Sequence, residues 1–589
     1  DNFGKERDKE GFSDKKKIIQ EQPPSKMKGG LKTMPFIIAN EAFEKVASYG
    51  LLLNMIFYLI IDYNMTIATG TSVLFIWNAL SNFMPIIGAF LSDSYLGRFR
   101  VISYASISSF MGMILLWLTT IIPAAKPIGK EAATSAQLGI LFASYVFMSI
   151  GAGGIRPCSL AFGADQLDNE ENPKNERVLQ SFFNWYYVSV GVSAMIAVTF
   201  IVYIQDKKGW RVGFGIPAIL MFLSAILFFV GSRLYVKMKA NKSLLTGFAQ
   251  VLVVSVKNRH LAFPPKNIDG WYHHDKGSKV VTPSDRIRCL NKACIIRNPE
   301  KDLYIDGSAL QPWNLCTVEQ VEELKALVKV IPLWSTGIMI AVTLSQHSFP
   351  VLQASTMDRH VTSSFEIPAG SFSVFAILTL TIWVALYDLI LVPIVSRFTG
   401  LPRGIGLKER MGIGLFISII ATAVSAMVED TRRRAAINQG LLNNPHGVVD
   451  MTAMWLIPQY CLTGLAEAFN AIGQIEFYYS QFPKSMSSIG VALFSLATAI
   501  ANLFGSLIVE VIGKLTKGER EEGWIADNLN KGRYDYYYWI LTIMSVINFV
   551  YFIFCSWAYG SCDEVVIKVY DSGEVKTKSR DMSLSTIAV

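Results

Sequence analysis

Charged side chains are scarce in this chain. Asp, Glu, Lys and Arg make up 17% of its 589 residues, whereas soluble proteins average roughly 25%. Hydrophobic residues make up 51% and aromatic residues 12%. This composition argues against a soluble globular protein and indicates an integral membrane protein.

Cysteine and histidine are also few, and neither forms a cluster. The seven cysteines are odd in number and scattered, which fits neither a disulfide framework nor a zinc site. The six histidines, His347 among them, do not gather within the apolar segments, and no nucleophile–base pair recurs there. We therefore expect no metal, no cofactor and no enzymatic activity.

From the start of the chain and from its net charge we expect neither a cleavable signal peptide nor a nucleic-acid-binding protein. The opening segment DNFGKERDKEGFSDKKK is hydrophilic and lacks the apolar core of a cleavable signal peptide. The net charge is +8, but no basic patch is interleaved with aromatic residues as in an RNA-binding protein. We expect no nucleic-acid partner, and we attribute the positive charge to membrane topology.

Long apolar runs fill most of the chain. A helix that spans a hydrocarbon core roughly 30 Å thick needs about 20 mostly apolar residues. Twelve runs meet this requirement, and they lie near residues 35–61, 70–92, 101–122, 137–162, 182–204, 212–236, 323–347, 369–396, 410–428, 451–480, 487–513 and 536–559.

Six runs precede a polar segment and six follow it. This organisation predicts an all-α membrane protein of the major facilitator fold, with twelve transmembrane helices in two six-helix halves and a substrate site between the halves at mid-membrane. The predicted regions are an N-terminal tail (1–34), a first half (35–236), a linker with a lateral helix (237–322), a second half (323–560) and a C-terminal tail (561–589).

Lys and Arg are concentrated in the tails, in the linker and in the loops after spans two and eight. These segments fall on one side of the predicted membrane, which identifies that side as cytoplasmic. The arginine run at 432–434 is an exception and falls outside. We expect both termini in the cytoplasm and the protein in the plasma membrane.

Three charged residues interrupt the first apolar run, in the segment NEAFEKVASYG at 40–50. A charge at the centre of a membrane helix costs roughly 2.5–3.5 kcal/mol, so it usually faces a partner or a water-filled cavity. Glu41 precedes Lys45 by four residues, the favourable order for an ion pair on one helix face, and Glu44 lies on the same side. Alternatively, the charges anchor the cytoplasmic end of a span that begins at Val46.

Two more charges lie deep in predicted spans. Arg156 follows Gly151, Gly153 and Gly154 in span four, and Glu467 lies at a similar depth in span ten. Small residues let helices approach closely, and the two charges could neutralise each other across the interface between the halves. We expect this pair to act as a gate; a static bridge that only fixes packing is the alternative.

Several segments resemble motifs of the proton-dependent oligopeptide transporter superfamily. They are EAFEK at 41–45, GAFLSDSYLGRFRVI at 88–102, GAGGIRPCSLAFGADQ in span four, FFNWYY at 182–187 and EAFNAIGQIEFYYSQFPKSM in span ten. The resemblance extends from about Lys28 to Gly560 and is specific to the plant nitrate/peptide transporter family (NPF), especially its first subfamily.

The resemblance implies a role for each deep charge. Glu41 and Glu44 would be the protonation sites and Lys45 their ionic partner. Arg156 would face the anion or peptide carboxylate, with Glu467 as its partner.

The resemblance also implies that Asp93 and Arg98 bridge helix ends on the cytoplasmic side. Two positions depart from the best-known nitrate transporter of the family. Its nitrate-binding histidine on span seven aligns with Val342 or Thr343, and its phosphorylated threonine aligns with Val101. A phosphorylation switch at that position cannot operate here.

The resulting expectation is proton-coupled symport of nitrate by alternating access, with protons, a small anion and the lipid bilayer as partners. Arg156, Thr343 and Gln346 would bind nitrate, which needs only a cation and a few donors. An organic carboxylate such as the hormone gibberellin, or a di- or tripeptide whose ammonium meets Glu467, is the alternative substrate. An uncoupled facilitator and a transport-deficient sensor are the alternative classes.

A coupled transporter should respond to pH in a defined direction. Uptake of labelled nitrate into proteoliposomes should rise as the external pH falls, because protons then drive the anion inward, and a protonophore should abolish the rise. Equal uptake at high and low pH would indicate a facilitator instead.

Overall fold

The computed structural model describes residues 29–167, 175–237, 244–264, 271–274, 282–304, 307–399, 404–483, 486–518 and 523–560. The C-terminal tail and all but residues 29–34 of the N-terminal tail lie outside these ranges. Within them, eleven helical segments are long and apolar enough to cross a membrane. A twelfth, α16 (Ile457–Gln481), carries more polar residues but packs against α13 and α15 in the same bundle.

Helices of the first half run from residue 31 to residue 233. They are η1 (Leu31–Thr33), α2 (Met34–Phe57), η2 (Tyr58–Asp62), α3 (Ile67–Leu91), η3 (Ser92–Leu96), α4 (Arg98–Ile121), η4 (Pro123–Ala125), α5 (Ser135–Leu167), α6 (Asn175–Ile196), η5 (Ala197–Ile201), α7 (Val202–Lys208), α8 (Trp210–Val230) and η6 (Gly231–Arg233). The linker contains α9 (Leu244–Lys257), η7 (Arg288–Cys294) and α10 (Pro299–Asp302).

The second half begins with α11 (Val318–Leu344), which Thr317 opens through a capping box with Gln320. The remaining helices are α12 (Ser348–Ser355), η8 (Ala369–Ser373), α13 (Val374–Leu386), η9 (Tyr387–Leu391), α14 (Val392–Thr399), α15 (Leu407–Asn438), η10 (Ala453–Leu456), α16, α17 (Ser487–Thr516) and α18 (Tyr534–Tyr559). Four short strands pair as β1 (Met357–Asp358) with β4 (Val449–Thr452) in parallel and β2 (His360–Thr362) with β3 (Phe365–Glu366) in antiparallel.

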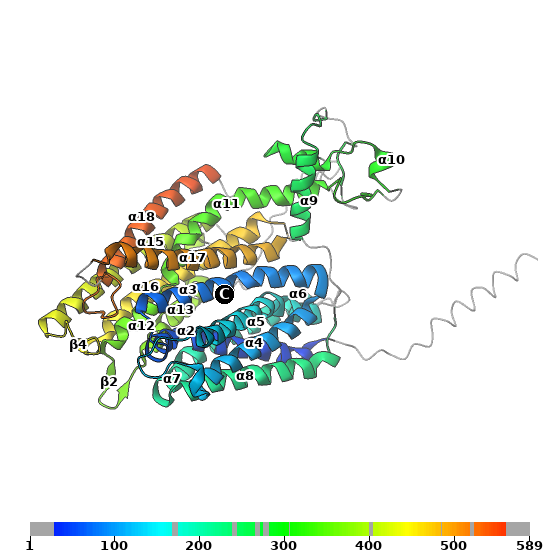
Figure 1. Cartoon of the computed structure of the whole chain (residues 1–589). Helices are drawn as coiled ribbons and strands as arrows, with labels where there is room; N and C mark the ends of the chain where they lie inside the picture. The colour runs from blue at the N-terminus through cyan, green and yellow to red at the C-terminus, as the bar shows by residue number, and fades with distance from the viewer. Residues whose placement is uncertain are drawn as a thin grey trace, which may run out of the picture.

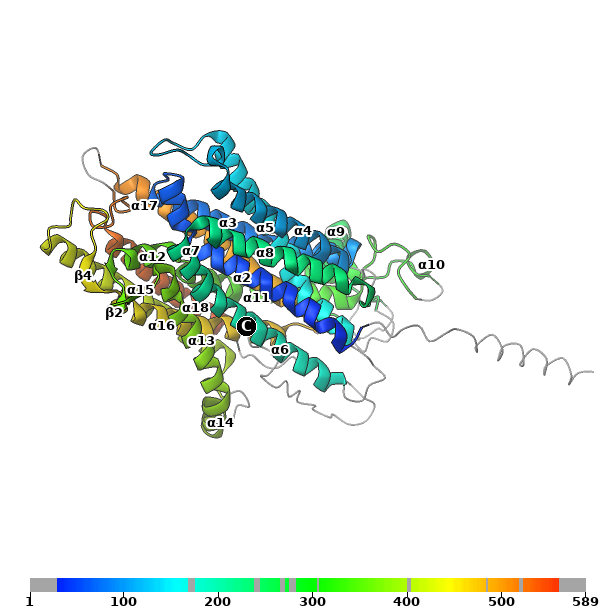
Figure 2. The same cartoon turned by 90° about the horizontal axis from the view of Figure 1, so that it is seen from below.

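The two halves form adjoining groups of helices, blue to teal for the first and green to red for the second (Figures 1 and 2). α3 and α17 pack extensively along the boundary. The linker lies at one end of the bundle, which we call the linker end. The opposite end, where α2 leads into α3, is called the far end.

The halves are joined by polar contacts at the far end. Three such contacts between described residues are Ser371 Oγ to Val198 O (2.8 Å), Ile67 N to Asp527 Oδ1 (2.8 Å) and Lys207 Nζ to Glu366 Oε2 (3.7 Å). The same end brings η8 against α2, η5 and α7. The described conformation is therefore closed at the far end.

The arginine run at 432–434, expected on the side opposite the cytoplasm, is partly buried. Arg432 is 0% exposed because α15 continues to Asn438, beyond the predicted end at 428. Its guanidinium contacts Glu429 (Nη2 to Oε1, 2.8 Å) and donates to Asn530 (Nη1 to Oδ1, 2.8 Å). Glu429 also accepts from Gln353 (2.7 Å). These bonds satisfy the buried charges and fasten α12 and the segment before α18 to α15.

Glycines of α5 let three helices of the first half approach closely. A Cβ at Gly153 would lie 2.5 Å from Met84 Cβ on α3, and one at Gly154 would lie 2.4 Å from Ala105 Cβ on α4. A Cβ at Gly88 would lie 2.0 Å from the Gly153 carbonyl oxygen. Residues with side chains would force these helices apart.

We expect Gly153→Ala to destabilise the protein. Overpacking typically costs about 1–3 kcal/mol, and the new methyl would meet the α3 backbone region. Gly139→Ala is the matched control, because it lies on the same helix with no atom within 4 Å of an added Cβ. Thermal unfolding in detergent should show a lower Tm for Gly153→Ala than for Gly139→Ala, and equal values would contradict the close-packing argument.

Candidate functional site

A cavity of about 1170 Å³ lies between the two halves. Residues of α2, α3, α5 and α6 line one side, and residues of α11, α13, α16 and α17 line the other. Most of the lining is apolar or aromatic, as shown by Leu52, Trp77, Met148, Ile377 and Trp383. Hydroxyl and amide side chains also border the cavity, and the charged residues of its lining are Arg156, Arg410 and Glu467. A mostly apolar surface with a few charged groups is usual for a site that binds an organic ligand.

Behind the first-half wall lies a compact group of four charges. The ion pair that the spacing predicted is present, with Lys45 Nζ 3.8 Å from Glu41 Oε1. Arg156 Nη2 lies 3.1 Å from Glu44 Oε1, which also accepts from Ser48 Oγ at 2.6 Å. Arg156 lines the cavity, with 24% of its side chain exposed, whereas the side chain of Glu44 is 1% exposed.

Burial leaves this group partly unsatisfied. Glu44 Oε2 and Glu41 Oε2 are buried and have no hydrogen-bond partner among the described residues. Arg156 Nε is also buried and has no hydrogen-bond partner among the described residues. A buried carboxylate oxygen without a donor is costly while it is charged, so each acid has an atom at which a proton could be held.

The predicted pairing of Arg156 with Glu467 is not seen in this conformation. Arg156 instead pairs with Glu44 of its own half, because α2 and α5 bring those side chains together. Glu467 lines the cavity from α16 and has no ion-pair or hydrogen-bond partner among the described residues. Arg156 borders the cavity from the first half, and Glu467 borders it from the second half.

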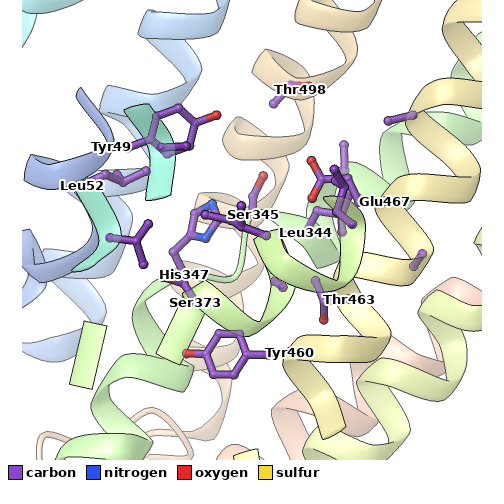
Figure 3. A pocket seen from close by; sticks show the side chains of 18 of the residues that line it. Tyr49, Leu52, Leu344, Ser345, His347, Ser373, Tyr460, Thr463, Glu467 and Thr498 are labelled. Carbon is purple, nitrogen blue, oxygen red and sulfur yellow. The ribbon is translucent and has the colours of Figure 1, made fainter. Parts of the chain in front are cut away.

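Span seven is broken where it meets the cavity. α11 ends at Leu344, and α12 restarts at Ser348 with His347 as its N-cap residue. The His347 ring is exposed to the cavity and has no hydrogen-bond partner among the described residues. Figure 3 shows it between Tyr49 and Leu52 on one side and Glu467 on the other.

Sequence reasoning passed over His347 because it looked for clusters of histidines. A usable signal was the polar sequence SQHS inside an apolar run, since interrupted helices often line transporter sites. Thr343 and Gln346, which the sequence predicted as substrate-binding residues, also border the cavity. Thr343 donates to Ile340 O (2.7 Å), and Gln346 bonds to Val342 O and to the Tyr537 hydroxyl.

At the linker end, Arg98 fastens helix ends together as the motif implied. Its Nη1 lies 2.6 Å from Asp165 on α5, and its Nε lies 3.9 Å from Asp93. Asp165 was not predicted as a partner. It belongs to the segment GADQ, whose acidic residue lies at the linker end of α5.

A second buried ion pair lies toward the linker end of the other half. Arg410 Nη1 lies 3.0 Å from Glu476 Oε2, and both side chains are almost fully buried. The Arg410 guanidinium also lies over the Tyr387 ring, 4.3 Å from its centroid. Arg410 and Tyr387 line the cavity, so each half presents one arginine that is already paired with a glutamate.

Comparison with known proteins gives a consistent result. The chain matches the POT family over residues 99–525. It is 56% identical to Protein NRT1/PTR FAMILY 1.2 of Arabidopsis thaliana over 558 residues, with 92% of each chain covered. It is also 56% identical to Protein NRT1/PTR FAMILY 1.1 of the same plant over 544 residues, covering 90% of this chain and 92% of the relative.

Solved structures share the fold at low sequence identity. An auto-inhibited POT family peptide transporter matches with a TM-score of 0.66 and 19% identity, covering 91% of this chain and 98% of the other. The POT family transporter PepTSo matches with a TM-score of 0.65 and 17% identity, covering 90% and 98%. The expected twelve-helix transporter fold is thereby confirmed. The chain belongs to the NRT1/PTR branch of the POT family, and it is a proton-coupled membrane transporter rather than an enzyme.

Proposed function

We propose that this protein is a symporter in which a substrate anion replaces the Glu44 carboxylate as the partner of Arg156. The observation that carries the proposal is the 3.1 Å ion pair between these residues at the cavity wall. While Glu44 is ionised, it neutralises the guanidinium. Once a proton occupies Glu44, Arg156 retains an uncompensated charge in a medium of low dielectric constant, and an anion in the cavity can neutralise it.

The charge balance of the whole group supports this coupling. With all four side chains ionised, Glu41 and Glu44 balance Lys45 and Arg156. One added proton leaves a net positive charge, and one bound monovalent anion cancels it. Lys45 is not among the residues that line the cavity, so Arg156 is the cation of this group that a substrate can reach.

Alternating access is supported by the arrangement of the two halves. The contacts Ser371–Val198 and Lys207–Glu366 close the far end in this state, and their separation would open it. The distribution of Lys and Arg supports a cytoplasmic linker and cytoplasmic termini. We infer transport between the far side and the cytoplasm, with the plasma membrane as the expected site.

The cavity favours an organic carboxylate over nitrate. Its volume of about 1170 Å³ and its largely apolar lining suit a substrate with an apolar body and one acidic group, such as gibberellin. Nitrate, the expectation from the sequence, would occupy a small part of this space. It remains the second candidate because Arg156, His347 and Thr343 offer a cation and polar groups that border one cavity.

Related folds accommodate both kinds of anion. A peptide transporter of the POT family has been solved in complex with sulfate, at a TM-score of 0.59 and 14% identity. Another POT family transporter has been solved in complex with 5-aminolevulinic acid, at a TM-score of 0.60 and 15% identity. These ligands belong to those proteins, and they support only the general compatibility of such a cavity with small anions and amino acids.

Glu44→Gln should separate exchange from proton-driven uptake. The amide mimics a permanently protonated acid, so Arg156 stays available to the anion, but the proton cycle is broken. We expect counterflow exchange to persist while pH-driven accumulation falls by at least about tenfold, a change equivalent to about 1.4 kcal/mol.

The matched control for this experiment is Glu510→Gln, which removes an exposed acid on α17. It should leave both exchange and accumulation unchanged. Accumulation by Glu44→Gln with normal pH dependence would contradict the role of Glu44.

Glu467→Gln should identify the substrate class. Its free carboxylate can bind an ammonium group, so a peptide or other zwitterion should lose transport in this variant, whereas gibberellin and nitrate should not. Labelled nitrate, gibberellin and a dipeptide should be tested in oocytes at low external pH.

Arg156→Gln should abolish uptake of the true substrate, and retained uptake would contradict the anion site.

A further inference from the structure

Helix α9 of the linker is apolar on two faces. Phe248, Val251 and Val254 are buried against η7 and α11, and they form the stripe that attaches the helix to the rest of the protein. An ordinary surface helix would present polar residues on its other side.

The outer face of α9 instead carries a second apolar stripe, consisting of Leu245, Ala249, Leu252, Val253 and Val256. The four large members are 37%, 51%, 49% and 65% exposed, respectively, and Ala249 is also exposed. The spacings of four, three, one and three residues place them on one side of a helix. Contiguous exposed apolar residues on a surface helix usually mark an interaction with a protein or a membrane, so this stripe needs a cover.

The position of α9 matches the surface of a membrane. In Figure 1 it lies across the end of α11, transverse to the membrane-spanning helices. A helix in this orientation runs along the bilayer surface. It is also too short to span a bilayer, with only 14 residues.

Basic residues lie at the C-terminal end of the helix. Lys257 and Arg259 are exposed there, and Lys257 also donates to Asn314. Arg288 and Lys292 lie 4.4 and 5.0 Å from the centroid of the Phe263 ring nearby. An apolar stripe beside basic residues is complementary to a bilayer with anionic headgroups.

We propose that α9 is an interfacial helix whose outer stripe inserts into the bilayer leaflet on the linker side, with Lys257 and Arg259 contacting anionic lipid headgroups. This role is independent of the transported substrate. It makes the lipid surface a second binding partner, attached through the element that packs directly against span seven.

Site-specific photocrosslinking tests the insertion. Benzoylphenylalanine is placed at Val253 in the full-length protein, reconstituted in vesicles of phosphatidylcholine with a minority of phosphatidylserine. The matched control position is Lys301 on α10, which is exposed elsewhere in the linker. We expect lipid adducts at position 253, detected by mass spectrometry, and at least tenfold fewer at position 301.

Three outcomes would overturn the proposal. Equal lipid adducts at the two positions would show that the stripe is not in the bilayer. A crosslink to a second copy of the chain, or to another segment of the same chain, would show that protein covers it. Absence of any adduct at position 253 would leave the stripe in water.

The headgroup contact has its own test in the same vesicles. The double variant Lys257→Gln/Arg259→Gln should lower the phosphatidylserine share of the adducts at position 253 to its share of the vesicle lipid, because both charges that attract the anionic headgroup are removed. Loss of the crosslink to both lipids would instead indicate that the variant displaces the helix, and circular dichroism with thermal unfolding would reveal it. An unchanged phosphatidylserine share would overturn the headgroup assignment.

Discussion

Charged side chains in a bilayer persist only in the company of opposite charges, and the pair of Arg156 and Glu44 shows what this demands of the fold. Removing one member would leave the other charge buried alone, which typically destabilises a protein by about 3–5 kcal/mol. The two helices that carry the pair must therefore stay in register. The same requirement makes the pair sensitive to one proton, since protonation of Glu44 has the electrostatic effect of removing it.

The glycines of α5 provide that register. Gly153 and Gly154 bring α3 and α4 to within contact of the α5 backbone, just before the helix presents Arg156. Arg98 then ties the linker end of the same helix to α4 through Asp165. The cation at the cavity wall is thus held between a close-packed segment and an ion pair, which limits where its side chain can reach.

Local patterns in the sequence were sufficient for the fold and for part of the site. Apolar runs located the spans, and the four-residue spacing located the Glu41–Lys45 pair, because both depend on neighbours along one helix. The partner of Arg156 could not be derived in this way. Glu44 and Glu467 are both deep acids, and the choice between them depends on how two helices pack, which no single-helix periodicity encodes.

Other features were missed for related reasons. Arg432 lies beyond the predicted end of span nine at residue 428, but a partner three residues earlier, Glu429, allows its charge to be buried within the longer helix α15. His347 lies at a break in a helix that hydropathy treats as continuous. The sequence indicated that α9 has an apolar face, whereas the packing of the linker was needed to show that a second apolar stripe of the helix stays exposed.

The balanced charges of the first half have a consequence for membrane voltage. Moving one elementary charge through 100 mV is worth about 2.3 kcal/mol. Glu41, Glu44, Lys45 and Arg156 lie close together and sum to zero when ionised, so helices that carry them can move through the field with almost no electrical work. The voltage across the membrane then acts on the cycle chiefly through whatever net charge the proton and the substrate add to this group.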